Sequence, residues 1–180
     1  MTASEILERL VTMAPVRTPD LPSDQRGIYA LIDHEGHISY IGSTSAANEN
    51  FRKRIHARHR TGSETYSHYF SKVYNCGRMY RCRLSQQGHP DADTAKWLRS
   101  QFIMEHCSAV YVPLNDSKAE IERLEAEVIR LAPFPCIRWN GATDLTYPEP
   151  TELVDALIEK LRLSSSERDA VERQRRLSLA

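Results

Sequence analysis

The chain of 180 residues is long enough for one domain with a proper hydrophobic core, and its 41% hydrophobic and 27% charged content is that of a soluble globular protein. We expect a cytoplasmic protein without a membrane partner, because no apolar run reaches membrane-spanning length and the residues after Met1 do not resemble a secretory signal. The four cysteines form no Cys-x-x-Cys pair, which favours free thiols in a reducing compartment.

The net charge of zero does not by itself favour a nucleic-acid partner, but the charges are unevenly distributed. Between residues 52 and 83 the only acidic residue is Glu64, whereas most compensating acids follow Pro90. This distribution predicts a basic face for a polyanion; the alternative is a solvated face whose counter-charges come from elsewhere in the fold. The basic residues of this stretch are Arg52, Lys53, Arg54, Arg58, Arg60, Lys72, Arg78, Arg81 and Arg83.

The N-terminal residues predict a short amphipathic helix followed by an extended linker. Residues 4–13 place their apolar side chains on one stripe, and Ser4 can cap that helix. Pro15, Pro19 and Pro22 then favour an extended chain. We expect the helix to contribute packing, and residues 1–24 form one N-terminal segment of helix and proline-rich linker.

The next stretch predicts a β-hairpin that presents two tyrosines. Residues 27–33 alternate between two faces, the polar residues 34–37 form a turn around Gly36, and residues 38–41 return antiparallel. Gly42 is expected to end the second strand at a position where a side chain would obstruct.

A basic helix is predicted after the hairpin. Asn48 or Asn50 can cap it, and Phe51 and Ile55, four positions apart, form its buried face. The remaining positions of the helix are largely basic.

Further elements follow by the same periodicity. A helix is expected at 66–74, a strand or added edge at 78–84, a loop at 86–90 and a helix at 93–106 with an apolar stripe. The stripe of this last helix consists of Trp97, Leu98, Phe102 and Ile103.

The clearest further strand is expected at 109–114, and the strongest helix at 119–131, with Leu131 ending the stripe that packs on the sheet. An irregular segment leads to Asn140, and Pro148-Glu149-Pro150 is expected to open a helix that continues to about Leu163.

Ser164, Ser165 and Ser166 would then cap a highly charged segment at 167–176. The predicted fold is α/β (α+β), with a small central antiparallel or mixed sheet of three to four strands flanked by helices. The predicted segments are 1–24, a central domain at 25–145, and a C-terminal helical extension at 146–180.

Two tripeptides make a specific resemblance possible. Gly27-Ile28-Tyr29 and Tyr40-Ile41-Gly42, at hairpin spacing and followed by a helical arginine, a helical glutamate and a later asparagine, resemble the GIY-YIG nuclease family. The resemblance covers residues 27–140 and implies a GIY-YIG-like fold.

The resemblance also implies roles for individual residues. Tyr29 would orient or deprotonate the attacking water, Tyr40 would hydrogen-bond the scissile phosphate, and Arg54, selected by Phe51 three positions earlier, would clamp the non-bridging oxygens. Asn140 would tie the active-site backbone or contact phosphate.

The metal ligand implied by the resemblance is one glutamate that binds Mg²⁺ or Mn²⁺. Glu122 and Glu125 both lie on the expected helix, and the spacing to Asn140 selects Glu125. Without the motif, Glu125 would be a solvated glutamate paired with Arg123 or Arg130.

The histidine of the site is less clear. The family carries a histidine or tyrosine four positions after the arginine, where this chain has Arg58. His59 can serve only if the helix ends or loosens there; His56 and His68 are the alternatives. Candidate nucleic-acid contacts are Arg52, Lys53, Arg58, Arg60, His68 and Lys72.

The expected function is a metal-dependent endonuclease acting on DNA, single-stranded or duplex. Tyr66, Tyr69 and Phe70 would suit stacking on single-stranded bases, or would be core residues. The alternatives are a non-catalytic nucleic-acid-binding module of the same fold and an interaction domain that uses the C-terminal helices.

A zinc site is not expected. Its possible ligands match no spacing of known zinc sites: Cys76, Cys82, His89, His106 and Cys107.

Overall fold

The computed structural model describes residues 1–64, 67–82, 89–142 and 145–179. The chain forms two compact units. The first comprises Met1–His59 and Met104–Thr143, and the second comprises Arg60–Ile103 and Asp144–Ala180. Among the described residues, no helix has the length and apolar character required to cross a membrane.

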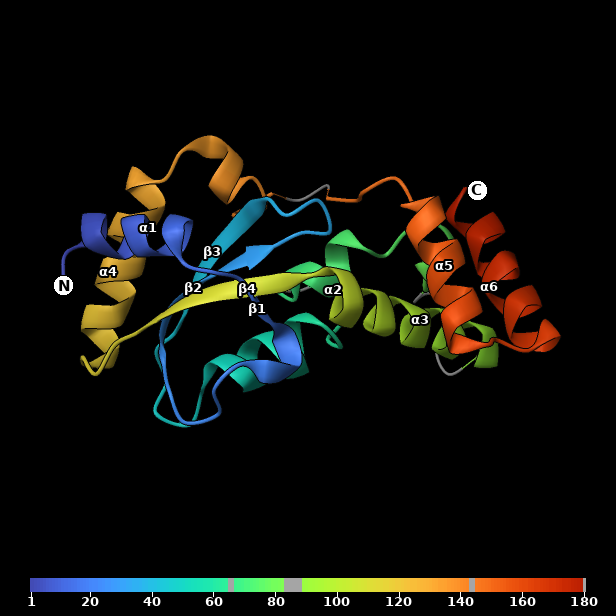
Figure 1. Ribbon diagram of the computed structural model, residues 1–180, viewed down its shortest axis with the longest axis horizontal. Coiled ribbons are helices and arrows are strands. Elements are labelled where there is room, and N and C mark those ends of the chain that lie inside the picture. Colours follow the sequence, from blue (N-terminus) through green and yellow to red (C-terminus); the bar gives the residue numbers. More distant parts are fainter. Residues whose placement is uncertain (65–66, 83–88, 143–144, 180) are drawn as a thin grey trace. The chain divides into compact units, whose positions relative to one another are not determined.

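The first unit is built on a four-stranded antiparallel sheet, which confirms the predicted class of fold (Figure 1). The strand order is β1-β4-β2-β3. The hairpin strands β2 and β3 and the strand β4 were predicted, whereas β1 lies inside the proline-rich linker and was not. The strands are β1 (Val16–Arg17), β2 (Gly27–Ile32), β3 (Ile38–Thr44) and β4 (Ser108–Pro113).

The two faces of this sheet have different neighbours. Helices α1 (Ala3–Thr12) and α4 (Lys118–Leu131) pack against one face, where Ile28 belongs to a continuous hydrophobic core with residues of both helices. Because side chains alternate along a strand, Tyr29 points to the opposite face. There its ring contacts Phe51, at the start of the basic helix.

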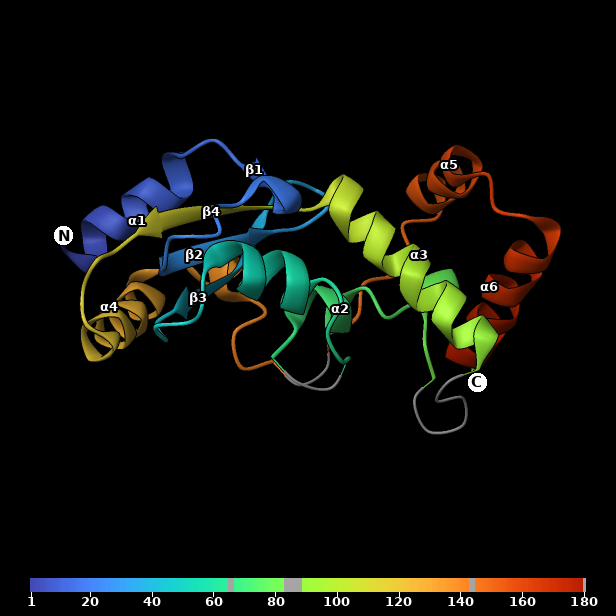
Figure 2. The same cartoon turned by 90° about the horizontal axis from the view of Figure 1, so that it is seen from below.

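The basic helix is a π-helix, η2 (Arg52–His59), drawn in teal in Figures 1 and 2. Asn50 caps it, because its Oδ1 accepts a hydrogen bond of 2.7 Å from the backbone N–H of Lys53. The linker holds the same helix: the backbone N–H of Phe51 donates to the Gln25 carbonyl, and that of Arg52 donates to the Pro22 carbonyl. The linker is therefore part of the support of η2, although it is not extended throughout as predicted, because Thr18–Asp20 forms the 3₁₀ helix η1.

The hairpin turn is fixed by a buried carboxylate. Asp33 accepts hydrogen bonds from the backbone N–H groups of Glu35 and His37, from the Ser39 hydroxyl, and from Arg138, with which it forms an ion pair. Oxygens of Asp33 and Glu35 and a ring nitrogen of His37 lie within 4.8 Å of one another. Since both Asp33 oxygens already accept hydrogen bonds, this group stabilises the turn.

The second unit contains mainly helices. These are α2 (Tyr69–Val73), η3 (Gly77–Met79), α3 (Pro90–His106, whose last residues belong to the first unit), α5 (Thr151–Leu161) and α6 (Ser165–Ser178). The predicted helix at 66–74 begins later, at Tyr69, and the predicted cap Ser164 is present.

The strand predicted at 78–84 is wrong for its described residues, because Gly77–Met79 is a 3₁₀ turn. The side chain of Arg78 is only 8% exposed and forms ion pairs of 2.5 Å with Glu149 and Asp155. These carboxylates come from the C-terminal part of the chain. They hold the Arg78 side chain in a buried position that the strand prediction did not anticipate. Arg83, the loop at 86–90 except its end, and Tyr66 lie outside the described residues.

Buried ion pairs also correct the prediction of one basic face. Arg78 is not available to a polyanion, and Arg81 lies 3.8 Å from Glu64, which also pairs with the fully buried Arg99. For these residues the alternative interpretation, counter-charges supplied by the fold, is the correct one.

Three details of the helices also differ from expectation. Thr2 rather than Ser4 caps α1, through a capping box with Glu5. Trp97 and Leu131, predicted in buried stripes, are 42% and 43% exposed. Both lie at the margin of their apolar stripe, where the sequence pattern does not determine burial.

Gly27 makes the close contact of β2 with β4 possible. It has φ +148°, and a Cβ there would lie 2.2 Å from the Val112 carbonyl oxygen, whereas Gly36, with φ +83°, has nothing within 4 Å of such a Cβ. We expect Gly27→Ala to lower the free energy of unfolding by about 3 kcal/mol or more, since overpacking adds to backbone strain. Gly36→Ala should cost only about 1–2 kcal/mol, the strain alone. Urea denaturation of both variants tests this, and equal losses would contradict it.

Candidate active site

Two tyrosines of the hairpin face η2 from adjacent strands. Tyr29 on β2 is opposite Gly42 on β3, and the ring centroids of Tyr29 and Tyr40 are 6.1 Å apart. A Cβ at position 42 would lie 2.8 Å from the Tyr40 hydroxyl and 2.9 Å from that of Tyr29. Gly42 therefore lets both phenols approach each other, but β3 continues beyond it to Thr44, contrary to the expectation that Gly42 ends the strand.

The π-helix brings His59 to these tyrosines. In a π-helix the hydrogen bonds join residue i to i+5, so residues five positions apart are one turn apart. Arg54 and His59 have this spacing. His59 is fully buried, and its Nε2 lies 2.7 Å from the Tyr29 hydroxyl.

The other two candidate histidines have different surroundings. His56 contacts the hydroxyl of Thr18 through Nδ1 at 3.0 Å, and His68 belongs to the second unit, where its Nδ1 lies 3.3 Å from the Ser63 carbonyl. The π-helical winding is the loosening of the helix that a role for His59 requires. It brings His59, and not His56, to the Tyr29 hydroxyl.

Burial and charge act in opposite directions on Tyr29. Desolvation raises its pKa to about 12, while the neighbouring Arg54 guanidinium and a hydrogen bond involving Tyr40 act to lower it. Desolvation lowers the pKa of Arg54, but Tyr29, Tyr40 and Glu49 outweigh it and raise that pKa overall. Arg54 Nε is buried and has no acceptor within the described parts of the chain.

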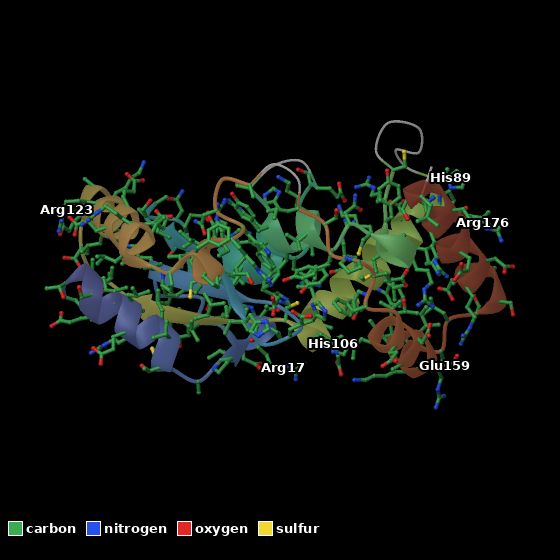
Figure 3. All side chains as sticks on the ribbon, turned by 90° about the horizontal axis from the view of Figure 1, so that it is seen from above. Arg17, His89, His106, Arg123, Glu159 and Arg176 are labelled. Carbon is green, nitrogen blue, oxygen red and sulfur yellow. The ribbon has the colours of Figure 1, made fainter. Side chains whose placement is uncertain are left out.

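Glu125 lies at the same site. Its carboxylate accepts a hydrogen bond of 2.5 Å from the Ser43 hydroxyl, and burial raises its pKa although Ser43 and Arg54 lower it. Arg123 pairs with Glu120 and Glu127 on the exposed side of α4 (Figure 3), so it is not the partner of Glu125.

The competing glutamate, Glu122, is exposed. It accepts a hydrogen bond of 2.9 Å from Ser45 and lies 3.8 Å from Lys118. The geometry therefore distinguishes the two glutamates: Glu125 is near Arg54 and Tyr29, and Glu122 is exposed to solvent.

Asn140 holds the edge of the sheet. Its Oδ1 accepts from the backbone N–H of Ile41 at 3.1 Å, and its Nδ2 donates to the Ile41 carbonyl at 2.7 Å. Trp139 adds a backbone hydrogen bond to Ser39. The residue between Tyr40 and Gly42 is thereby fixed, which corresponds to the backbone-tying role.

The predicted nucleic-acid contacts divide between the units. Arg52, Lys53 and Arg58 are exposed on η2. Arg60, His68 and Lys72 belong to the second unit, where Arg60 donates a hydrogen bond of 2.5 Å to Ser100.

An acidic residue that the sequence did not single out opposes the basic helix. Glu49 lies 3.6 Å from Lys53 and 2.9 Å from Arg58, and its side chain is 14% exposed. In the sequence, only the position of Glu49 just before η2 could have indicated this contact.

Ser43 was also missed. Ser43 directly follows Gly42 and lies two residues after Ile41, which faces α4. Because side chains alternate along β3, the sequence could have indicated that Ser43 also faces α4.

The residues present fit a hard divalent cation. Glu125 is half-buried, its carboxylate accepts a hydrogen bond from Ser43, and a single carboxylate with waters is a common Mg²⁺ arrangement.

Comparison with protein-family models, curated proteins and solved structures finds no match to this chain. The likeness to the GIY-YIG family therefore depends on the motif residues.

The environment of Tyr29 predicts a pH dependence of stability. Because its pKa rises from 10 to about 12 on folding, its contribution is fully present below pH 10 and is lost as the pH rises towards 12. We expect unfolding free energies of the wild type to fall by about 2 kcal/mol more than those of Tyr29→Phe across this window. Denaturant titrations at several alkaline pH values measure the difference, and parallel curves would contradict it.

Proposed function

We propose that this protein is a metal-dependent endonuclease that hydrolyses DNA phosphodiester bonds by a GIY-YIG-type mechanism with Mg²⁺ or Mn²⁺. The observation that supports it is the cluster of Tyr29, Tyr40, Arg54 and His59, with Glu125 near enough to influence the pKa of Tyr29. Phosphodiester hydrolysis needs an activated nucleophile and charge compensation at the phosphoryl oxygens, and a cation, two phenols and a metal-binding carboxylate can supply both.

Arg54 would bind the phosphate. Its planar guanidinium can contact two non-bridging oxygens, and its buried Nε–H has no acceptor among the described residues. The Tyr40 hydroxyl would donate to the same phosphate. Glu125 would hold the divalent cation, which when bound supplies charge stabilisation at the phosphoryl oxygens.

Tyr29 and His59 would move the proton. Because burial disfavours the phenolate, Tyr29 accepts a proton from the attacking water only as it passes its own to Nε2 of His59. The water oxygen then bonds to phosphorus while the bond to the leaving oxygen breaks.

A second candidate is a nucleic-acid-binding module that does not cut. The raised pKa of Tyr29 favours it, since a neutral phenol is a poor base. The two candidates differ in one measurable property, cleavage that requires both the metal and Glu125.

Cleavage of labelled single-stranded DNA, duplex DNA and RNA, with Mg²⁺ and with chelator, tests the proposal. We expect the wild type to cut DNA only with the metal, and Glu125→Ala to lower the rate by at least about 100-fold, because the cation loses its carboxylate. Glu122→Ala is the matched control on the same helix and should keep nearly full activity.

Well-folded wild type that binds but never cuts would favour the second candidate. Equal losses in both glutamate variants would contradict the choice of Glu125.

Glu49 should weaken the binding of DNA. Glu49→Gln removes the counter-charge of Lys53 and Arg58, so we expect tighter DNA binding at low salt and a slope of log K against log salt steeper by about one. Glu35→Gln, an exposed carboxylate of the hairpin turn, is the control for net charge. Fluorescence anisotropy over a salt series measures both, and equal effects would assign the change to net charge alone.

A further inference from the structure

The second unit contains a cavity of about 490 Å³ at the C-terminal end of α6. Its walls come from residues 75–77 and 80, from residues 146–149 and 151, and from the C-terminal end of α6 with the residue after it. Tyr80, Tyr147, Glu149, Arg175 and Ser178 are among the residues that line it. This volume is large enough for a nucleotide-sized ligand.

One wall of the cavity is a supported aromatic ring. Tyr147 stacks on Tyr74 with ring centroids 5.5 Å apart and planes at 16°, and Tyr74, which is fully buried, contacts Phe102. The backbone N–H of Tyr147 donates to the Val73 carbonyl. Tyr147 is half-buried and lines the cavity, and its stack on Tyr74 fixes the orientation of its ring there.

A second wall is a fixed carboxylate. The side chain of Glu149 is 8% exposed, and it accepts hydrogen bonds from the side-chain Nε of Arg78 at 2.5 Å and from its backbone N–H at 3.1 Å. It lies directly over Gly77, where φ is +50° and a Cβ would be 1.9 Å from the carboxylate. A carboxylate can accept about four hydrogen bonds, so Glu149 can still accept donors from a ligand.

The rim of the cavity carries a positive charge. The side chain of Arg175 is 45% exposed, with its Nε 3.9 Å from Glu149 and its Nη1 3.7 Å from Glu172. Both distances exceed those of a close ion pair, so Arg175 can turn to a ligand anion.

We infer that this cavity binds an unpaired nucleobase that stacks on Tyr147 and donates to Glu149, with its phosphate at Arg175. Stacking on aromatic rings accepts every base, whereas a carboxylate favours bases that offer adjacent N–H donors, guanine above all. Uracil places a carbonyl on each side of its single N–H. The inference goes beyond the proposed cleavage and does not depend on it.

The base can come from a free nucleotide or from single-stranded nucleic acid. Isothermal titration of the full chain in chelator distinguishes these two sources. The ligands are guanosine and uridine 5′-monophosphates, ribose 5-phosphate, and a short single strand with and without its bases. We expect guanosine monophosphate to bind at least about 3-fold tighter than uridine monophosphate, and ribose 5-phosphate to bind weakest. Tight binding of the strand alone, lost when its bases are removed, would identify the strand as the source.

Variants of the wall make the test specific. Tyr147→Leu should weaken binding by about 10-fold, and Tyr147→Phe should retain it, because the ring face remains. Trp97→Leu, an exposed aromatic residue of α3 that does not line the cavity, is the matched control and should bind as the wild type does. Ser178→Trp places a large side chain at the cavity wall from α6, outside the Tyr147–Tyr74 stack, and should also weaken binding by at least about 10-fold.

Three results would overturn the inference. The first is that neither nucleotide nor the strand binds at millimolar concentration. The second is that ribose 5-phosphate binds as tightly as the nucleotides. The third is that Tyr147→Leu and Ser178→Trp bind the nucleotides as tightly as the wild type does. Circular dichroism of each variant establishes that it is folded. Because cleavage is not measured, failure of this inference is distinguishable from failure of the proposed nuclease.

Discussion

The hydrogen bond between the Tyr29 hydroxyl and His59 Nε2 organises the first unit, because it requires both the hairpin and the helix to have unusual geometry. The hairpin must lack a side chain at Gly42 so that the phenols can face η2. The helix must be wound as a π-helix so that His59, not Arg58, turns towards the sheet. A π-turn costs stability relative to an α-helix, and here the burial of His59 against two tyrosine rings offsets that cost.

The linker before the hairpin supports this arrangement from outside the motif. Carbonyls of Pro22 and Gln25 accept the first N–H groups at η2, and Thr18 contacts His56 on the side of the helix away from Tyr29. Proline favours the extended backbone that leaves these carbonyls free of local hydrogen bonds. Linker residues for which the sequence indicated no role therefore help to determine where the basic helix lies.

The sequence predicts elements whose signal is local and misses those that depend on distant partners. The hairpin and β4 follow from alternation, and α4 follows from its apolar stripe. The short strand β1 exists only because Val16 pairs with Ala109, far along the chain, and the expected strand at Arg78 is absent because Glu149 and Asp155 bind that side chain. At the candidate site, the motif gives the tyrosines, Arg54 and Glu125, but position alone could not decide among the histidines, since that choice depends on how the helix is wound.

The distribution of arginines explains how a chain of zero net charge could still bind a polyanion. In the second unit Arg78 is buried in ion pairs with Glu149 and Asp155, and Arg99 is buried in an ion pair with Glu64. Loss of Glu64, or of both partners of Arg78, would leave a buried charge uncompensated. These arginines therefore contribute to folding, whereas exposed cations remain on η2. Glu49 reduces their effect on a ligand, so electrostatic attraction alone would give weak and salt-sensitive binding. If nucleic acid binds here, contacts with bases would contribute a larger share of the affinity, because stacking on an aromatic ring depends less on salt than ion pairing does.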